Sequence, residues 1–507
     1  MRLAGELEHG ELLEGGPRAA RDEPVEERFP LGQRAVAVRV FESDANLVPP
    51  RVVRWGALAA SLLDACDEGR IDRLAQIDRE QIVRRENGFD RTGCVVDQLG
   101  NENVATGRAA FRWLASDAVE VNISADLTKM DQQGPSDKYT FLNPQFNFNQ
   151  QWSNGVAVPV FNLPYDTHFL TDDPYTGYHR FGSDPLFNRD VQNVNELEHW
   201  GVATTIEWQL SDNVQFKSIT SYREFENTFG RDSDGTPLPV DHTWDTSIHD
   251  QLTQEFQITG VAADGRLDWA TGLFYYDAED SNQGWNFLYP FILSTNNHKD
   301  VQTIESTAVF FHGTYDFNDV LSLTAGLRFT DDQKDVNVFR QDFRTGAVII
   351  PNTPVSVDAQ ETSPKIGLNW QLNDNLMTYV QWATGFRGGG FGPRPANPLQ
   401  VAAFDVEEVE TLEGGVKTDL RDGRLRVNSA IFVSEAKNQQ QGTQEFDASG
   451  AIWFRTVNTG KSKYRGLEVE LLSNPIDALQ IEASVGYIRY DRVDPGVSGL
   501  CRFRADG

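Results

Sequence analysis

Residues 321–330 read Leu-Ser-Leu-Thr-Ala-Gly-Leu-Arg-Phe-Thr, with an apolar side chain at every second position and polar or small ones between. Successive side chains of a β-strand point to opposite faces, so this stretch predicts a strand with one apolar face. An amphipathic helix would need apolar spacings of three and four residues, which the stretch lacks. The same alternation recurs at residues 119–128, 425–433 and 479–487. The chain is therefore predicted to be all-β.

Short turn sequences join the alternating stretches in pairs. Asp, Asn, Ser and Gly tolerate turn dihedral angles and hydrogen-bond to nearby backbone, so they indicate hairpins. Seven such dipeptides occur, at Ser116-Asp117, Ser211-Asp212, Asp264-Gly265, Asn318-Asp319, Asn373-Asp374, Asp422-Gly423 and Asn474-Pro475. Seven hairpins predict about fourteen antiparallel strands.

Aromatic residues stand at a constant distance from four of these turns. Each lies four positions before the turn Asp, at Trp113, Trp208, Tyr315 and Trp370. This placement is typical of the aromatic girdle at one interface of a membrane barrel. A large soluble β-sandwich or propeller remains the alternative, because aromatic residues near turns are common there too.

The opposite strand ends are expected to carry long polar connections, at residues 129–201, 224–251, 278–304, 331–362, 385–410 and 434–463. Compact soluble domains rarely have connections longer than about 15 residues. Short turns on one side and long loops on the other are typical of outer-membrane barrels. This asymmetry favours an antiparallel transmembrane β-barrel over a soluble fold.

Composition excludes some classes of protein and leaves others open. The chain has 507 residues, 39% of them hydrophobic, and no stretch of about 18 apolar residues, which argues against membrane-spanning helices. Barrel strands dilute the hydropathy signal, so a barrel is still allowed. The net charge of -30, from 75 acidic and 45 basic residues, argues against nucleic acid as a partner.

Several segments, in order, resemble barrel segments of TonB-dependent outer-membrane receptors. They are Gln215–Arg223, Gln254–Ile258, Ser363–Trp370, Tyr379–Phe391, Glu407–Lys417 and Tyr464–Glu470. The resemblance runs from about Arg84 to Arg492. It implies a 22-stranded barrel in the outer membrane of a Gram-negative bacterium, with its lumen plugged by an N-terminal domain. It also implies capture of a small ligand such as a siderophore–iron chelate, and import driven by the TonB energy-coupling complex.

The two ends of the chain depart from the family pattern. Residues 1–83 are rich in Glu, Arg and Ala and are expected to form an atypical extension, with short helices at 55–66 and 71–84. Residues 84–507 are expected to form the incomplete barrel. No signal peptide, coupling box or plug is recognised before Arg84, and about eight of the family's strands are unaccounted for. A truncated or frameshifted gene product is therefore expected.

Aromatic residues set among amides in the predicted loops are the candidates for ligand binding. Exposed aromatic side chains with amide partners suit capture of an aromatic chelate or a sugar. The candidate substrate-binding residues are Phe146, Phe148, Trp152, Trp285, Phe287 and Tyr289. The alternative is that these loops pack on one another or insert shallowly at the lipid interface.

Catalytic and metal-binding patterns are weak. The stretch Asp232-Ser233-Asp234-Gly235 resembles half of a calcium loop but lacks the later ligands, so an ordinary turn is expected. His242 and His249 share a predicted loop and could face a ligand. No catalytic residue, metal site or cofactor is predicted, and the chain is not expected to be an enzyme. The alternatives to an energy-coupled importer are a passive outer-membrane porin and a soluble β-rich binding protein.

Overall fold

The protein is represented by a computed structural model. It describes residues 36–42, 80–83, 95–134, 138, 140–141, 167, 170, 176–177, 179, 181–183, 189–236, 241–288, 294–392, 394–421, 423–446 and 452–494. By its internal contacts the chain forms two compact units, 1–35 and 36–507, and all of these residues belong to the second. Among them, no helix is long and apolar enough to span a bilayer.

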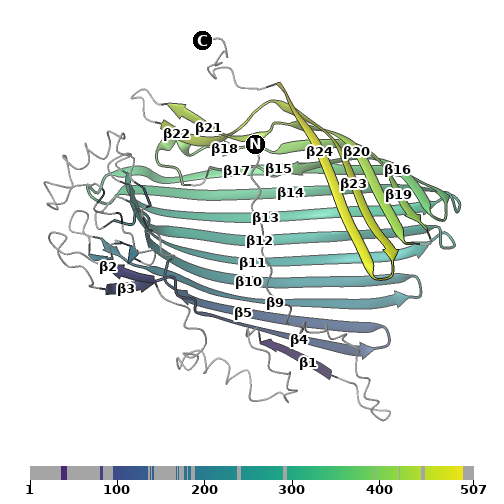
Figure 1. The fold of residues 1–507 in the computed structure, drawn as a ribbon, viewed down its shortest axis with the longest axis horizontal. Coiled ribbons are helices and arrows are strands. Elements are labelled where there is room, and N and C mark those ends of the chain that lie inside the picture. The colour runs from purple at the N-terminus through teal and green to yellow at the C-terminus, as the bar shows by residue number, and fades with distance from the viewer. Residues whose placement is uncertain are drawn as a thin grey trace, which may run out of the picture. The chain divides into compact units, whose positions relative to one another are not determined.

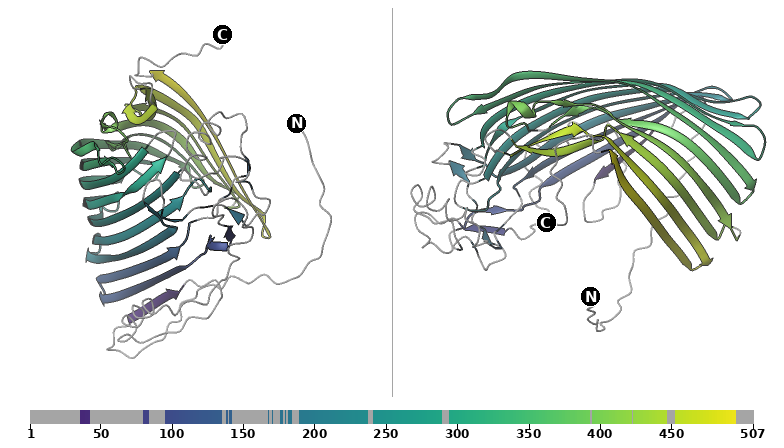
Figure 2. Two further views of the ribbon diagram at one scale, coloured as in Figure 1. Left: turned by 90° about the vertical axis from the view of Figure 1, so that its left-hand side faces the viewer. Right: turned by 90° about the horizontal axis from the view of Figure 1, so that it is seen from above.

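One antiparallel sheet of fifteen strands dominates the described part of the chain (Figure 1). Fourteen of its strands form seven sequential hairpins, and β1 (Val36–Glu42) pairs with β4 as the fifteenth. The hairpin strands are β4 (Val104–Ser116), β5 (Val119–Gln132), β9 (Val194–Ser211), β10 (Val214–Asp232), β11 (Asp241–Ala262), β12 (Leu267–Leu288), β13 (Ser294–Asp316), β14 (Leu321–Asp342), β15 (Val348–Asn373), β16 (Leu376–Arg387), β19 (Glu407–Leu420), β20 (Leu425–Lys437), β23 (Lys461–Ile476) and β24 (Leu479–Asp494). Figure 2 shows that this sheet is strongly curved. The predicted all-β class and the fourteen strands are confirmed.

Small sheets accompany the main one. They are β2 (Glu80–Val83) with β3 (Val95–Leu99) and β6 (Thr176–Gly177), β7 (Gly182–Ser183) with β8 (Asp190–Val191), β17 (Gly390–Phe391) with β18 (Ala403–Phe404), and β21 (Gln440–Phe446) with β22 (Ile452–Asn458). One 3₁₀ turn, η3 (Pro398–Gln400), completes the described elements.

The tight turns lie where the sequence predicts them, with one exception. Asp264 and Gly265 adopt φ of 57° and 84°, in the left-handed region that the β11–β12 turn requires. The turn predicted at Asn474-Pro475 is wrong, because both residues lie in β23 and the chain reverses at residues 477–478. Pro475 is tolerated there because it lies within the irregularity of the β23–β24 register between Ser473 and Ile476, outside the regular ladder.

The predicted loops at the other strand ends are partly wrong. The connections between β10 and β11, β12 and β13, and β14 and β15 shrink to residues 233–240, 289–293 and 343–347, because the strands continue for 19 to 26 residues. A membrane needs only about 9–11 residues per tilted strand. Beyond the bilayer both faces meet water or protein, so the alternating pattern fades although the strand continues. Long connections are retained between β5 and β9, β16 and β19, and β20 and β23.

The residue register separates an apolar face from a polar one. Val380, Ile431, Leu467 and Tyr487 lie in one row across β16, β20, β23 and β24, with Gly414 of β19 between the first two, and all four side chains are exposed. Exposed apolar side chains in a continuous row match the lipid-facing band of a barrel.

The neighbouring rows are polar and internally bonded. The Tyr379 hydroxyl donates to Glu413 at 2.7 Å, and Gln381 donates to the same carboxylate at 2.9 Å. On the same face, Lys217 pairs with Glu207 at 2.9 Å across β10 and β9. This is the polar interior face expected of a barrel.

The predicted aromatic girdle is also visible. Trp113, Trp208 and Trp370 have exposed side chains close to the short turns at one end of the sheet. Trp208 lies directly opposite Val119, which is the first residue of β5 after the β4–β5 turn. The girdle and the apolar row together mark the depth at which the sheet meets lipid.

The expected N-terminal extension of residues 1–83 contains sheet elements. Strand β1 lies inside it and pairs with β4, and residues 80–83 form β2 where the end of a helix was expected. The remainder of the predicted helices at 55–66 and 71–84 lies outside the described residues. The compact units divide after residue 35, whereas the predicted domain boundary at 83/84 stays a prediction.

A pair of adjacent residues tests the assignment of the two faces. Ile431 is 63% exposed in the apolar row, whereas Ala430 lies opposite Glu468 on the polar face. We expect Ile431→Arg to lower the free energy of unfolding in lipid by about 2–4 kcal/mol, because the guanidinium would enter hydrocarbon. Ala430→Arg should cost far less. Denaturant unfolding in lipid vesicles measures both, and equal costs would contradict the assignment.

Candidate functional site at the long-connection end of β10–β14

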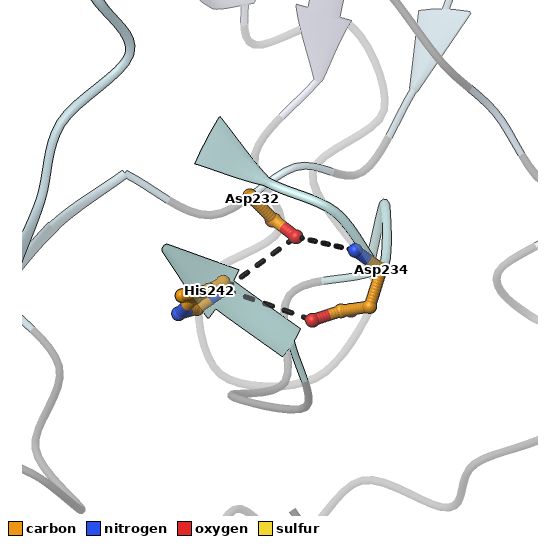
Figure 3. Close-up of side chains that lie close together, drawn as sticks. All are labelled: Asp232, Asp234 and His242. Atoms are coloured by element: carbon orange, nitrogen blue, oxygen red, sulfur yellow. Dashed lines mark hydrogen bonds and ion pairs between the residues drawn. The ribbon is translucent and has the colours of Figure 1, made fainter. Parts of the chain in front are cut away.

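Two aspartates and a histidine come together where β10 ends and β11 begins (Figure 3). Asp232 is the last residue of β10, and it lies directly opposite His242, the second residue of β11. The His242 Nε2 atom is 3.5 Å from Oδ1 of Asp232 and 3.7 Å from Oδ2 of Asp234. One donor atom from each of the three side chains lies within 4.8 Å of the others.

The local backbone explains how the two carboxylates are held. The Asp232 carboxylate accepts the backbone N–H groups of Asp234 and Gly235 at 3.0 and 3.1 Å. These are the bonds of an Asx turn, by which an aspartate stabilises the chain reversal that follows it. Gly235 has φ of 61°, which favours glycine at this point of the turn.

Asp234 is held by residues that follow it, in the connection and at the start of β11. Its Oδ1 accepts the N–H and the hydroxyl of Thr236 at 3.0 and 2.5 Å, and its Oδ2 accepts the N–H of Asp241 at 2.8 Å. Both carboxylates are thus oriented by hydrogen bonds before any ligand is present.

Burial dominates the electrostatics of this cluster. The side chains of Asp232 and His242 are 0% exposed and that of Asp234 is 3% exposed. Burial raises the pKa of Asp234 well above its usual range, and the charge of Asp232 adds to this, while His242 opposes it. A buried His179 contributes a second imidazole, with Nδ1 3.9 Å from Oδ2 of Asp232. Carboxylate oxygens and imidazole nitrogens are ligands for divalent metal ions.

A buried apolar cluster adjoins these residues. Val191 of β8, Trp285 and Phe287 of β12 form its core, and partly buried Phe181, Trp244 and Phe343 pack against it. The ring of Phe287 lies edge-on to that of His242, with centroids 4.7 Å apart. The cluster therefore joins the β5–β9 connection to the ends of β11 and β12.

Two predicted ligand-binding residues lie in this cluster. Trp285 and Phe287 were expected to be exposed loop residues, but they lie in strand β12 and are 8% and 0% exposed. That expectation is wrong, because the strand continues to residue 288 and the β8 segment packs over it. The other candidates, Phe146, Phe148, Trp152 and Tyr289, lie outside the described residues.

Ion pairs occupy the polar face at the same end of the sheet. His298 of β13 lies 2.7 Å from Asp245 of β11, across the intervening β12. Gly284 of β12 lies between them, and a Cβ there would stand 2.5 Å from the Asp245 carboxylate. Arg340 makes a two-bond pair with Asp300 and also donates to the Pro395 carbonyl at 2.9 Å. These contacts brace the strand extensions against one another.

The sequence indicates only parts of this site. His242 and His249 share strand β11 but are seven residues apart, so they point to opposite faces and do not meet. His249 instead pairs with Asp280 at 2.6 Å. The sequence does not group Asp232, Asp234 and His242, because it predicts a single loop over residues 224–251. A hairpin centred on residues 233–240 would have placed His242 beside Asp232.

Comparison with known proteins places this architecture. The family model described as "TonB dependent receptor-like, beta-barrel" matches residues 128–500. The chain belongs to this family. The family consists of receptors and transporters of the Gram-negative outer membrane, so the predicted localisation is confirmed and the soluble alternative is not favoured.

Individual relatives are distant and longer. The metal-pseudopaline receptor CntO of Pseudomonas aeruginosa is 25% identical over 202 residues, which are 39% of this chain and 26% of that protein. The ferric yersiniabactin uptake receptor FyuA of Yersinia pestis superimposes with a TM-score of 0.57 at 14% identity, covering 82% of this chain and 55% of that one. The siderophore receptor PiuA of Acinetobacter baumannii gives 0.53 at 17% identity, covering 79% and 58%. The chain spans little more than half the length of these solved receptors.

A substitution in the buried cluster separates packing from ligand contact. We expect Trp285→Ala to lower the free energy of unfolding by about 3–5 kcal/mol, because it removes a large buried side chain. The matched control is Phe141→Ala, since Phe141 is 69% exposed and should change little. Thermal unfolding followed by circular dichroism measures both variants. A Trp285→Ala protein as stable as the control would contradict the burial described here.

Proposed function

We propose that the protein imports a small-molecule metal chelate across the outer membrane, with energy supplied through TonB, and that it leaves its ligand chemically unchanged. The observation that carries the proposal is the two-faced sheet of a family member. One face presents exposed apolar rows to lipid, and the other presents bonded polar rows to an interior. A polar interior across the bilayer gives a hydrophilic ligand a route that lipid denies it.

Energy coupling is part of the proposal. The outer membrane holds no ion gradient of its own, so accumulation of a scarce ligand needs work delivered from the inner membrane. Family membership supports a TonB complex as the partner that delivers it. A passive porin is the second candidate, since it would have the same polar interior but would only equilibrate its solute.

The ligand class is supported by the relatives. Receptors for metal–pseudopaline and for ferric yersiniabactin are similar to this chain in sequence and in fold respectively. An iron chelate is therefore the ligand class we propose. Phe146, Phe148, Trp152 and Tyr289 stay our proposed ligand contacts, because aromatic rings stack well on aromatic chelators.

Uptake in cells tests the coupling. The probe is a siderophore extracted from iron-starved cultures of the host and loaded with radioactive iron. We expect deletion of the gene to abolish most of the uptake, and a protonophore to reduce wild-type uptake to the level of the deletion strain. Supplying the gene on a plasmid should restore uptake to the deletion strain. The protonophore should then reduce this restored uptake again.

Two results would contradict the proposal in different ways. Uptake that needs the gene but persists with the protonophore indicates a passive porin. Uptake of the iron chelate that is unaffected by the deletion excludes this ligand class.

A further inference from the structure

We propose that Asp232, Asp234 and His242 bind a resident divalent transition-metal ion of the zinc class, which fixes the β10–β11 connection at the end of the sheet. This ion is a structural component and is distinct from any transported cargo. The proposal does not rest on the transport function, since it concerns only buried side chains of this chain.

The spacing of the donor atoms is the first support. Zinc lies about 2.0–2.2 Å from nitrogen and oxygen ligands in tetrahedral sites, so neighbouring ligand atoms are about 3.3–3.6 Å apart. The Nε2 atom of His242 lies 3.5 and 3.7 Å from carboxylate oxygens of Asp232 and Asp234. These distances are long for a hydrogen bond and close to the edges of such a tetrahedron.

The second support is that each carboxylate is already oriented. Backbone N–H groups of Asp234 and Gly235 hold Asp232, while Thr236 and Asp241 hold Asp234. Hydrogen-bonded partners of this kind orient metal ligands and raise affinity. The three ligands therefore need little rearrangement to close on an ion.

A third support is burial. The two carboxylates and the imidazole have almost no solvent exposure, and the ring of Phe287 lies edge-on to that of His242. An apolar shell of this kind limits the access of solvent to a bound metal ion.

The ligand types select the class of metal. Calcium and magnesium take oxygen ligands almost exclusively, and calcium uses six to eight of them. An imidazole with two carboxylates instead suits zinc and neighbouring first-row ions. His179 of the β5–β9 connection adjoins the three ligands, with Nδ1 3.9 Å from Oδ2 of Asp232. The ion would lie beside the apolar cluster of Trp285 and Phe287.

The wild-type protein gives the primary test. Protein purified from outer membranes in detergent is stripped with a chelator, titrated with zinc chloride in a calorimeter, and loaded separately with cobalt(II). We expect one zinc ion per chain, a higher unfolding temperature with zinc than without, and the intense visible absorption of tetrahedral cobalt. Absence of zinc binding by folded wild-type protein overturns the proposal. Stabilisation by calcium chloride but not by zinc chloride overturns the assigned metal class.

Variants then locate the ion. His242→Gln and Asp234→Asn should each weaken zinc binding by more than about 100-fold, because loss of a group that merely orients a ligand already costs about 10–100-fold. The matched control is His249→Gln. His249 lies on β11 away from the cluster, and this variant breaks its pair with Asp280 of β12. It should bind zinc like the wild type.

The cobalt spectrum, together with circular dichroism, distinguishes loss of the metal site from loss of folding. Asp234→Asn keeps the volume of the side chain, so a folded variant should shift or lose the cobalt absorption while its circular dichroism stays native. An unchanged cobalt spectrum in both cluster variants, or an equal loss in His249→Gln, places the ion elsewhere and overturns the proposal.

Discussion

The hydrogen-bonding requirement of the backbone in lipid is the constraint on which this structure depends. Inside hydrocarbon there is no water to satisfy N–H and C=O groups, so a spanning β-strand must pair on both sides. Every strand between the edge strands β1 and β24 of the fifteen-stranded sheet meets this requirement through antiparallel ladders with both neighbours, and half of the ladders come from the seven sequential hairpins. Pairing in turn fixes the register, and the register decides which side chains meet lipid.

Beyond the bilayer the same strands position buried side chains. Strands such as β13 and β15, with 23 and 26 residues, are more than twice as long as the crossing requires. The extensions of β10 to β14 and the β10–β11 connection carry buried side-chain groups described above: the Asp232–Asp234–His242 cluster, the apolar cluster around Phe287 and the Arg340–Asp300 pair. Rigid strand ends position such groups more precisely than mobile loops would. The proposed metal site depends on this rigidity.

Much of the fold is predictable from the sequence, because one face of each crossing segment is apolar and the other is not. Residues 321–330 show this alternation. The hairpin turns at Asp264-Gly265 and Asn318-Asp319 are predictable as well, because their residue types favour turns. The strand extensions could not be predicted, because outside lipid the selection for alternating apolar residues disappears. For that reason Trp285 and Phe287 were expected in an exposed loop.

The candidate site depends on contacts that the sequence order hides. Asp232 and His242 are ten positions apart, and only the register of β10 against β11 makes them opposite neighbours. His179 comes from a separate connection, and no local pattern links it to Asp232. The residues of this site become neighbours only through the strand register and through the β5–β9 connection, so the site cannot be recognised before the fold is known.

Accessibility along residues 321–330 is the most direct measurement of the central claim that these strands cross lipid with one face outward. Single cysteines at each position of the protein in vesicles, spin-labelled and exposed to oxygen and to a water-soluble nickel complex, report the surroundings of each side chain. The account predicts a period of two, with high oxygen accessibility at Leu323, Leu327 and Phe329 and lower accessibility at Thr324 and Arg328. Uniform access of the nickel complex at all ten positions would contradict it.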